Sequence, residues 1–252
     1  LHLEGPHLSL ARKGAHDPAL IRPMTAQDLA LLTEAAARLP VLMMTIAPEN
    51  VTLAQAEALA RAGVLLSLGH TDTDYATSLA YREAGVVCVT HLFNAMRPFG
   101  SREPGVVGAA LDSGGLSAGL IADGIHVHPA SMRVALHAKQ GPGQVYLVTD
   151  AMAPAGTEIE SFELNGREIR RSGGRLTLAD GTLAGADLEM TRALKVLVDE
   201  VGQSPEQALR AATAIPASVA GIEAGRLAIG TRTRLARLSP GFDACTPIDP
   251  EG

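Results

Sequence analysis

The sequence is poor in cysteine, in aromatic residues and in positive charge. Its 252 residues include two cysteines, no tryptophan and 3% aromatic residues, and the formal net charge is −6. Cys88 and Cys245 form neither a disulfide framework nor a closely spaced metal-binding pair, which fits a reducing compartment. Without basic stripes or stacking rings, the chain lacks the usual means of binding nucleic acid.

Long hydrophobic runs are also missing. Apolar stretches such as VLLSL at 64–68 are far shorter than the roughly 18 residues that a transmembrane helix needs. No basic segment followed by an apolar one indicates a signal peptide. We therefore expect a cytoplasmic protein that acts on a small molecule and binds neither nucleic acid nor a membrane.

The sequence does contain a regular alternation of short apolar runs and Ala-rich stretches, which predicts the α/β class with parallel strands. With 46% hydrophobic residues, the chain can bury a full core. Six runs predict strands, at 1–4, 41–49, 64–70, 85–91, 116–126 and 144–150. Helices are predicted at 25–39, 52–63, 73–85 and 187–201 and after Ser204-Pro205, with Thr73 as N-cap and Gly85 as the end of the third.

The C-terminal third has a different pattern. At 162–183 the pairs NG, GG and DG separate alternating residues, which predicts hairpins. The segment GRLAIGTRTRLARLSP at 225–240 predicts strands, whereas DACTPIDPEG after it does not. We therefore expect a β/α domain at 1–222 with a hairpin insertion near 162–183, followed by a strand segment of a small β domain at 223–252.

Polar residues follow the predicted strands at the points where active sites of parallel β/α barrels lie. They are Glu4, His70, His91, His126 and Asp150. Two imidazoles and a carboxylate can hold a divalent ion such as Zn²⁺ with one position left for water, whose pKa falls to about 7. A further carboxylate, such as Asp150, can take the water proton and pass it to a leaving group. These residue types indicate metal-assisted hydrolysis but do not identify the substrate.

Six segments of the chain resemble one family. They are LHLEGPHLSLARKGAHDP, SLGHTDTDY, THLFNAMRPFGSREPGVVGAAL, LIADGIHVHP, LVTDAMAPAG and TLAGADLEM. In order and approximate spacing they are similar to the N-acetylglucosamine-6-phosphate deacetylases of the amidohydrolase superfamily. The resemblance implies a (β/α)₈ TIM-type barrel that removes acetate from N-acetyl-D-glucosamine 6-phosphate, giving D-glucosamine 6-phosphate in amino-sugar catabolism and cell-wall recycling.

The resemblance also implies roles for individual residues. Glu4, His70 and His91 match the ligands of one divalent metal ion, for which Zn²⁺ is expected and Fe²⁺, Co²⁺ and Mn²⁺ are alternatives. Asp150 matches the general acid and base. The matching substrate-binding positions are His16, Asn94, the backbone of Ala95, Arg102 and His126. Some phosphate contacts of the family come from a neighbouring subunit, so a homodimer is expected and Arg102 is a candidate for that contact.

By the same resemblance, Glu4 stands at the end of the third barrel strand. The chain is therefore expected to lack the first two strands, the H-x-H pair that binds a second metal in many amidohydrolases, and the N-terminal part of a small β-sandwich domain that 225–239 completes. Some family members work with one ion. Ala186 stands where Ser is expected.

Each candidate residue has a simpler alternative. Glu4 can be a solvated residue at a chain end, His70 and His91 can cap helices, and Asp150 can be a turn residue. Arg102 can form a surface ion pair with Glu103, which contributes little to stability. The other histidines are expected to be structural or surface residues: His2, His7, His128 and His137.

Two further functions stay open. One is another amidohydrolase activity, such as deacetylation of N-acetylgalactosamine 6-phosphate or hydrolysis of a cyclic amide, although the HLEGP and THLFNAM segments argue against the cyclic amidases. The other is a truncated fragment that binds a metal or a sugar phosphate without turnover. A comparison of substrates would distinguish the first, and binding without turnover would identify the second.

Overall fold

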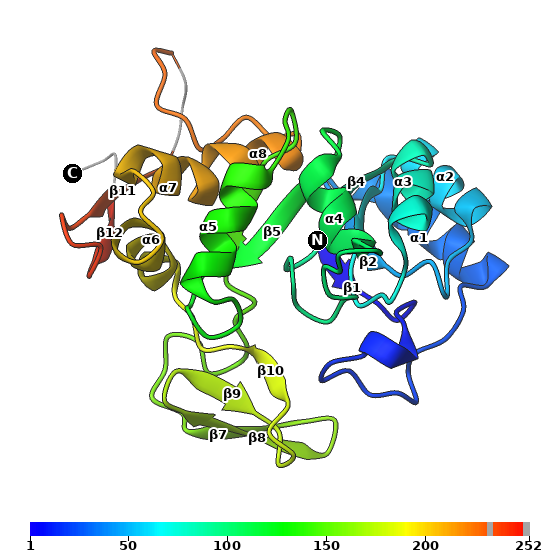
Figure 1. Cartoon of the computed structure of the whole chain (residues 1–252), viewed down its shortest axis with the longest axis horizontal. Coiled ribbons are helices and arrows are strands. Elements are labelled where there is room, and N and C mark those ends of the chain that lie inside the picture. Colours follow the sequence, from blue (N-terminus) through cyan, green and yellow to red (C-terminus); the bar gives the residue numbers. More distant parts are fainter. Residues whose placement is uncertain (231–233, 249–252) are drawn as a thin grey trace. The chain divides into compact units, whose positions relative to one another are not determined.

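The computed structural model of the chain describes residues 1–230 and 234–248. The described chain divides into two units by its internal contacts. The first unit comprises Leu1–Gly119 and Ala138–Gln144, and the second comprises Leu120–His137 and the residues from Val145 onward. Figure 1 labels most of the strands and helices.

Six parallel strands follow one another in sequence order in a single sheet. They are β1 (His2–Glu4), β2 (Met43–Ile46), β3 (Leu65–Leu68), β4 (Val86–Val89), β5 (Ser117–Ile121) and β6 (Val145–Val148). Each lies within a run that the sequence predicted to be a strand. The parallel β/α class is therefore confirmed.

The register of the sheet places polar residues in one row. Glu4 pairs with Thr45, Thr45 with Ser67, and Ser67 with Cys88. Paired residues of parallel strands point to the same face, so the side chains of this row share a face with Glu4. Apolar strand residues such as Met44, Leu66 and Leu68 are at most 1% exposed.

Helices alternate with the strands of the first unit. They are α1 (Ala26–Arg38), α2 (Leu53–Arg61), α3 (Tyr75–Glu83) and α4 (Gly105–Asp112), and a short 3₁₀ helix spans Leu10–Arg12. The N-cap of α3 is Asp74, not Thr73 as predicted, because Asp74 Oδ1 accepts the N–H of Thr77 at 2.7 Å. Gly85 follows α3 with φ 104°, and a side chain there would lie 2.5 Å from Ala60 Cβ of α2, so this position requires glycine.

The second unit contains further helices and an antiparallel sheet. The helices are α5 (Pro129–Ala138), α6 (Met190–Asp199), α7 (Pro205–Ala212) and α8 (Ala214–Val219). Strands β7 (Ser161–Leu164), β8 (Arg167–Ser172), β9 (Arg175–Thr177) and β10 (Leu183–Ala186) form a sheet of their own in the order β10-β9-β8-β7 (Figure 1). Asn165-Gly166 and Gly173-Gly174 join its strands with positive φ at both turn residues, as type I′ hairpin turns require.

The last described strands differ in part from the prediction. Strand β11 (Leu235–Leu238) lies within the predicted segment, whereas the residues 225–230 are not in a strand. Strand β12 (Cys245–Ile248) pairs with β11 in the DACTPIDPEG segment, where the prediction of no strand was wrong. The predicted segment 223–252 also includes 231–233 and 249–252, which lie outside the described residues, and the domain division at residue 222 stays a prediction.

In the described part of the chain, every helix is too short or too polar to cross a membrane.

Replacement of Thr25 by Ala should destabilise α1. Thr25 Oγ1 accepts the Asp28 N–H at 3.2 Å, and Asp28 Oδ2 accepts the Thr25 N–H at 2.9 Å. We expect Thr25→Ala to lower the free energy of unfolding in urea by about 1 kcal/mol. Thr33→Ala, at an exposed interior position of the same helix, is the control and should be neutral or slightly stabilising. An equal loss of unfolding free energy in Thr25→Ala and Thr33→Ala would contradict the capping role of Thr25.

Candidate metal centre

Three side chains from neighbouring strands of the first unit converge on one point. Glu4 ends β1, and His70 and His91 lie in the loops directly after β3 and β4. Glu4 Oε1 lies 3.1 Å from His70 Nε2 and 3.0 Å from His91 Nε2, and the two Nε2 atoms are 3.0 Å apart. Two ligands of a tetrahedral zinc ion lie about 3.3 Å apart. Among the described residues, no other three His, Cys, Asp or Glu side chains form such a group.

The His70 ring is held in the tautomer that a metal ligand needs. Its Nδ1 lies 2.8 Å from the main-chain carbonyl oxygen of Arg12, which can only accept a hydrogen bond. Nδ1 therefore carries the proton, and in the neutral ring Nε2 presents its lone pair to Glu4 and His91. Electron-rich atoms at this separation repel one another unless a proton or a metal cation lies between them. The donor set therefore fits a divalent ion.

Burial and charge also favour a ligand set. His70 and His91 are 5% and 4% exposed. Burial alone raises the pKa of the Glu4 carboxyl, but the two imidazoles, which donate to it when protonated, outweigh burial and hold the pKa well below its usual range. A metal cation in place of those protons acts on the carboxyl in the same direction.

Left-handed backbone marks several predicted site residues. Seven described residues other than glycine have positive φ, among them His70 (46°), His91 (28°), Ala95 (47°) and Asp150 (51°). Such conformations cost about 1–3 kcal/mol each and persist where the surrounding structure fixes them, often at functional sites. The backbone conformation does not depend on the sequence motifs. It nevertheless marks four residues that the sequence also predicted to belong to the site.

Two further candidates of the first unit lie beside the three ligands. The His16 ring meets the His70 ring edge-on, with 4.6 Å between the ring centroids. The Asn94 main-chain N–H donates to the His91 carbonyl at 2.9 Å, and Asn94 Nδ2 lies 3.3 Å from the same oxygen. The structure therefore brings His16 and Asn94 to the group that Glu4, His70 and His91 form.

Arg102 lies in the exposed loop before α4. Its neighbour Glu103 accepts the main-chain N–H groups of Tyr75 at 2.8 Å and Gly105 at 2.9 Å. Within the described ranges, Arg102 forms no ion pair with Glu103 or with another carboxylate. The structure therefore does not contain the Arg102–Glu103 surface ion pair that was the alternative. The role of Arg102 in binding the phosphate stays a prediction.

Asp150 and His126 lie in the second unit. Asp150 follows β6, and its carbonyl oxygen accepts the N–H of Ala186, a buried residue of β10, at 2.8 Å. Ala186, where Ser was expected, thus helps to fix the backbone of Asp150. His126 Nδ1 lies 2.6 Å from Asp123 Oδ2, and both side chains are almost fully buried.

Asp123 was not among the predicted site residues. Its Oδ1 accepts the main-chain N–H groups of Ile125 and His126, each at 2.8 Å. Burial raises the pKa of Asp123, but the His126 ring and these N–H groups outweigh burial and lower it. The pair Asp123-Gly124 was a usable signal, because Asp before Gly is typical of a turn in which the side chain binds the following backbone.

A second missed feature is a row of buried hydroxyls in the first unit. Thr90 Oγ1 lies 2.8 Å from Thr45 Oγ1 and 2.6 Å from Ser67 Oγ. A side chain at Gly69 would lie 2.7 Å from Thr45 Cγ2 and 2.8 Å from Thr90 Cβ, so the residue before His70 must be glycine. Thr45 and Ser67 interrupt apolar strand runs, which was the signal available in the sequence.

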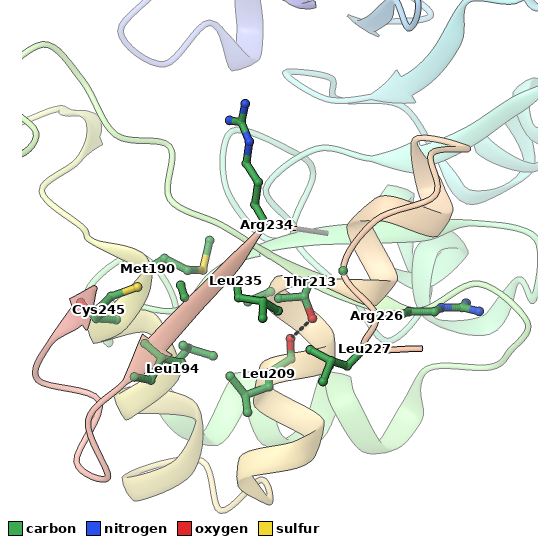
Figure 2. A pocket seen from close by; sticks show the side chains of 14 residues that line it. Met190, Leu194, Leu209, Thr213, Arg226, Leu227, Arg234, Leu235 and Cys245 are labelled. Atoms are coloured by element: carbon green, nitrogen blue, oxygen red, sulfur yellow. Dashed lines mark hydrogen bonds between the residues drawn. The ribbon is translucent and has the colours of Figure 1, made fainter. Parts of the chain in front are cut away.

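A cavity of about 330 Å³ lies elsewhere, in the second unit. Figure 2 shows Met190, Leu194, Leu209 and Leu235 around it, so its wall is largely apolar. None of the predicted site residues lines this cavity.

Comparisons with known proteins agree with this geometry. The model of the amidohydrolase family matches residues 1–240. The chain is 41% identical to an N-acetylgalactosamine-6-phosphate deacetylase of Shewanella sp. (strain ANA-3), over 86% of this chain and 54% of that protein. It is 36% identical to an N-acetylglucosamine-6-phosphate deacetylase of Haemophilus influenzae, over 96% of this chain and 64% of that protein.

A solved structure is also similar. The crystal structure of N-acetylglucosamine-6-phosphate deacetylase from Pasteurella multocida has a TM-score of 0.91 and 33% identity, over 98% of this chain and 64% of that chain. This likeness supports the predicted barrel type of fold. The chain spans about half to two thirds of the length of these relatives.

Loss of the Asp123 carboxylate should destabilise the fold in a pH-dependent way. Because its pKa is lowered in the folded chain, ionised Asp123 adds stability above the ordinary carboxyl value of 3.8, and this gain is lost as the pH falls through the lower folded value. We expect Asp123→Asn to lower the free energy of unfolding by about 1–3 kcal/mol at pH 7. Urea unfolding of the parent chain and of Asp123→Asn from pH 7 to pH 3 measures this. The difference between their free energies of unfolding should shrink below pH 3.8.

Glu223→Gln, at an exposed carboxylate of the same unit, is the matched control and should unfold like the parent chain at every pH. A difference between the parent chain and Asp123→Asn that stays constant, or grows, as the pH falls would contradict the assigned cause.

Proposed function

Because the chain belongs to the amidohydrolase family, we propose that it hydrolyses the acetamido group of N-acetyl-D-glucosamine 6-phosphate, giving acetate and D-glucosamine 6-phosphate. The convergence of Glu4, His70 and His91 within 3.1 Å carries this proposal. The names of the Haemophilus and Pasteurella relatives support the choice of substrate. We further propose a cytoplasmic location and a homodimer, as the resemblance implies.

Glu4, His70 and His91 are the proposed ligands of one divalent ion. Two imidazole nitrogens and a carboxylate suit Zn²⁺, and the same set also accepts Fe²⁺, Co²⁺ or Mn²⁺. When bound, the ion supplies a Lewis acid that polarises the acetyl carbonyl and makes a water molecule more acidic. The protein holds the ligands in place through the left-handed backbone of both histidines and the tautomer of His70.

Asp150 is the proposed general base and acid. Its carboxylate accepts a proton from the attacking water as the water oxygen bonds to the acetyl carbon, and then donates that proton to the amine nitrogen as the carbon–nitrogen bond breaks. His16, whose ring contacts the His70 ring, is proposed to donate a hydrogen bond to the acetyl carbonyl or to a sugar hydroxyl.

The proposed phosphate contacts are Asn94, the Ala95 backbone, Arg102 and His126. The backbone around Ala95 supports this choice, because φ is positive at His91, Phe93 and Ala95 but not at the residues between them. Alternation of this kind turns main-chain N–H groups toward one side and makes concave anion sites. Within the described residues, the Ala95 N–H donates no hydrogen bond. Arg102 is exposed and is proposed to contact the phosphate of its own chain or of a partner in the homodimer.

A second candidate substrate is N-acetyl-D-galactosamine 6-phosphate. The relative from Shewanella sp. that bears this activity in its name is 41% identical to the chain, compared with 36% for the Haemophilus glucosamine enzyme. The two substrates differ only in the configuration of one hydroxyl group, and both fit the same metal, acid–base and phosphate groups.

Two variants separate metal binding from proton transfer. Asp150→Asn should keep zinc through dialysis and lower the rate of acetate release by about 10²- to 10⁴-fold, because it removes the proton acceptor. His70→Ala should lose both zinc and activity, because it removes a ligand. His137→Ala, at an exposed histidine, should keep both. Near-normal turnover by Asp150→Asn would refute the acid–base role.

A comparison of the two epimers tests the substrate. Acetate release by the zinc-loaded 252-residue chain should be faster from N-acetylglucosamine 6-phosphate than from N-acetylgalactosamine 6-phosphate, as judged by kcat/KM. The reverse order would favour the second candidate. Zinc and sugar-phosphate binding with no acetate release from either compound would identify a binding fragment and contradict the proposed activity.

A further inference from the structure

The carboxylate of Asp72 connects loops that follow several strands of the first unit. Asp72 lies two residues after the proposed ligand His70, in the loop after β3. Its Oδ1 accepts a hydrogen bond from Arg12 Nε at 2.8 Å and forms an ion pair with Arg12 Nη2 at 2.7 Å. Its Oδ2 accepts one from Arg97 Nη2 at 3.1 Å. One carboxylate therefore joins the segments after β1, β3 and β4.

The main chain at Asp72 is itself fixed from the loop after β2. Glu49 Oε1 accepts the Asp72 N–H at 2.7 Å, and Glu49 Oε2 accepts the Thr71 hydroxyl at 2.7 Å. Both oxygens of Glu49 thus hold the two residues that follow His70. The main chain at Asp72 is therefore held by Glu49 independently of Arg12.

Arg12 in turn holds the His70 ring. The Arg12 carbonyl oxygen accepts the Nδ1–H of His70 at 2.8 Å, and this contact selects the tautomer that presents Nε2 to Glu4. The same short turn binds the His70 main chain, because the Ser9 N–H donates to the His70 carbonyl at 2.8 Å and the Arg12 N–H donates to the Ser9 carbonyl at 3.1 Å. A displacement of the Arg12 main chain would therefore move the acceptor that orients the His70 ring.

These ion pairs are not placed where they would add much to stability. The side chains of Arg12, Asp72 and Arg97 are 33%, 35% and 36% exposed, and pairs with that much solvent contribute little to the free energy of unfolding. The carbonyl that binds His70 belongs to the main chain and cannot be removed by substitution. The Arg12–Asp72 pair is the side-chain contact that fixes its position.

We propose that Asp72 is a positioning residue for the metal centre: it anchors Arg12, whose carbonyl orients the His70 ring toward the ion. The inference rests on the proposed metal centre. Groups that orient a metal-bound histidine typically change metal affinity by about 10- to 100-fold when they are removed. Because Asp72 acts through Arg12, its effect should lie at the lower end of that range.

The test is the affinity of the 252-residue chain for Co²⁺, measured by titration of the visible absorption of the bound ion. Asp72→Asn and Arg12→Ala should each weaken Co²⁺ binding about tenfold. The double variant should bind Co²⁺ no more weakly than either single variant, because both substitutions remove the same Arg12–Asp72 ion pair. If Asp72→Asn does not fold, Arg12→Ala removes the other partner of the same ion pair and tests the proposal in its place.

Two variants are matched controls. Arg97→Ala removes the other ion pair of the same carboxylate and leaves Arg12 bound, so Co²⁺ affinity should change less than about twofold. Asp74→Ala removes the side-chain cap of α3 two residues further along the chain, so it should lower the melting temperature but leave Co²⁺ affinity unchanged. A loss of Co²⁺ affinity in Asp74→Ala as large as in Asp72→Asn would show a general loss of structure and overturn the inference.

A second measurement requires no metal. In ¹⁵N NMR spectra of the histidine rings, metal-free parent chain should show His70 with the proton on Nδ1, and Asp72→Asn should show a mixture of tautomers. A parent chain that does not bind Co²⁺ would contradict the proposed metal centre, whatever Asp72 does. A parent chain that binds Co²⁺, together with an Asp72→Asn variant of equal affinity and unchanged His70 tautomer, would overturn the positioning role alone.

Discussion

Three electron-rich atoms within 3.1 Å of one another are the constraint on which the first unit depends. Glu4 Oε1 and the Nε2 atoms of His70 and His91 repel one another without a cation, so the fold must hold them from outside. It does so with rigid strand ends, with left-handed backbone at both histidines, and with the Arg12 carbonyl on His70. At Gly69, directly before His70, Thr45 Cγ2 and Thr90 Cβ leave no room for a side chain.

The candidates of the second unit are held by similar means. Asp150 has left-handed backbone after its strand, as His70 and His91 have after theirs, and its carbonyl is tied to Ala186. The His126 ring is oriented by a buried carboxylate, Asp123, just as the His70 ring is oriented by a carbonyl. In both units the candidate residues lie in loops that follow strands, and a further contact fixes the ring of His70 or His126 or the backbone of Asp150.

The alternating pattern predicted the six parallel strands and, because such strands bring their carboxyl ends together, a group of polar residues at those ends. The choice of Glu4, His70 and His91 among these residues as metal ligands came from the family resemblance. The sequence did not predict α4, whose residues Gly105–Leu111 are all buried and therefore show no polar face. Nor did it predict the contacts of Arg12 with Asp72 and His70, which are about 60 residues away in sequence. Such contacts depend on loop conformations, which hydrophobic periodicity does not describe. Strand β12 was missed because all four of its residues are exposed, so that no apolar alternation marks it.

Anomalous diffraction at the zinc absorption edge tests whether Glu4, His70 and His91 hold one divalent ion. Crystals of the chain grown with Zn²⁺ should show one strong peak between the three side chains, about 2.0–2.2 Å from Glu4 Oε1 and from Nε2 of each histidine. Full occupancy there, together with loss of the peak in His91→Ala, is the predicted result. A peak at another site, or none beside the three side chains at saturating Zn²⁺, would contradict a metal centre formed by Glu4, His70 and His91.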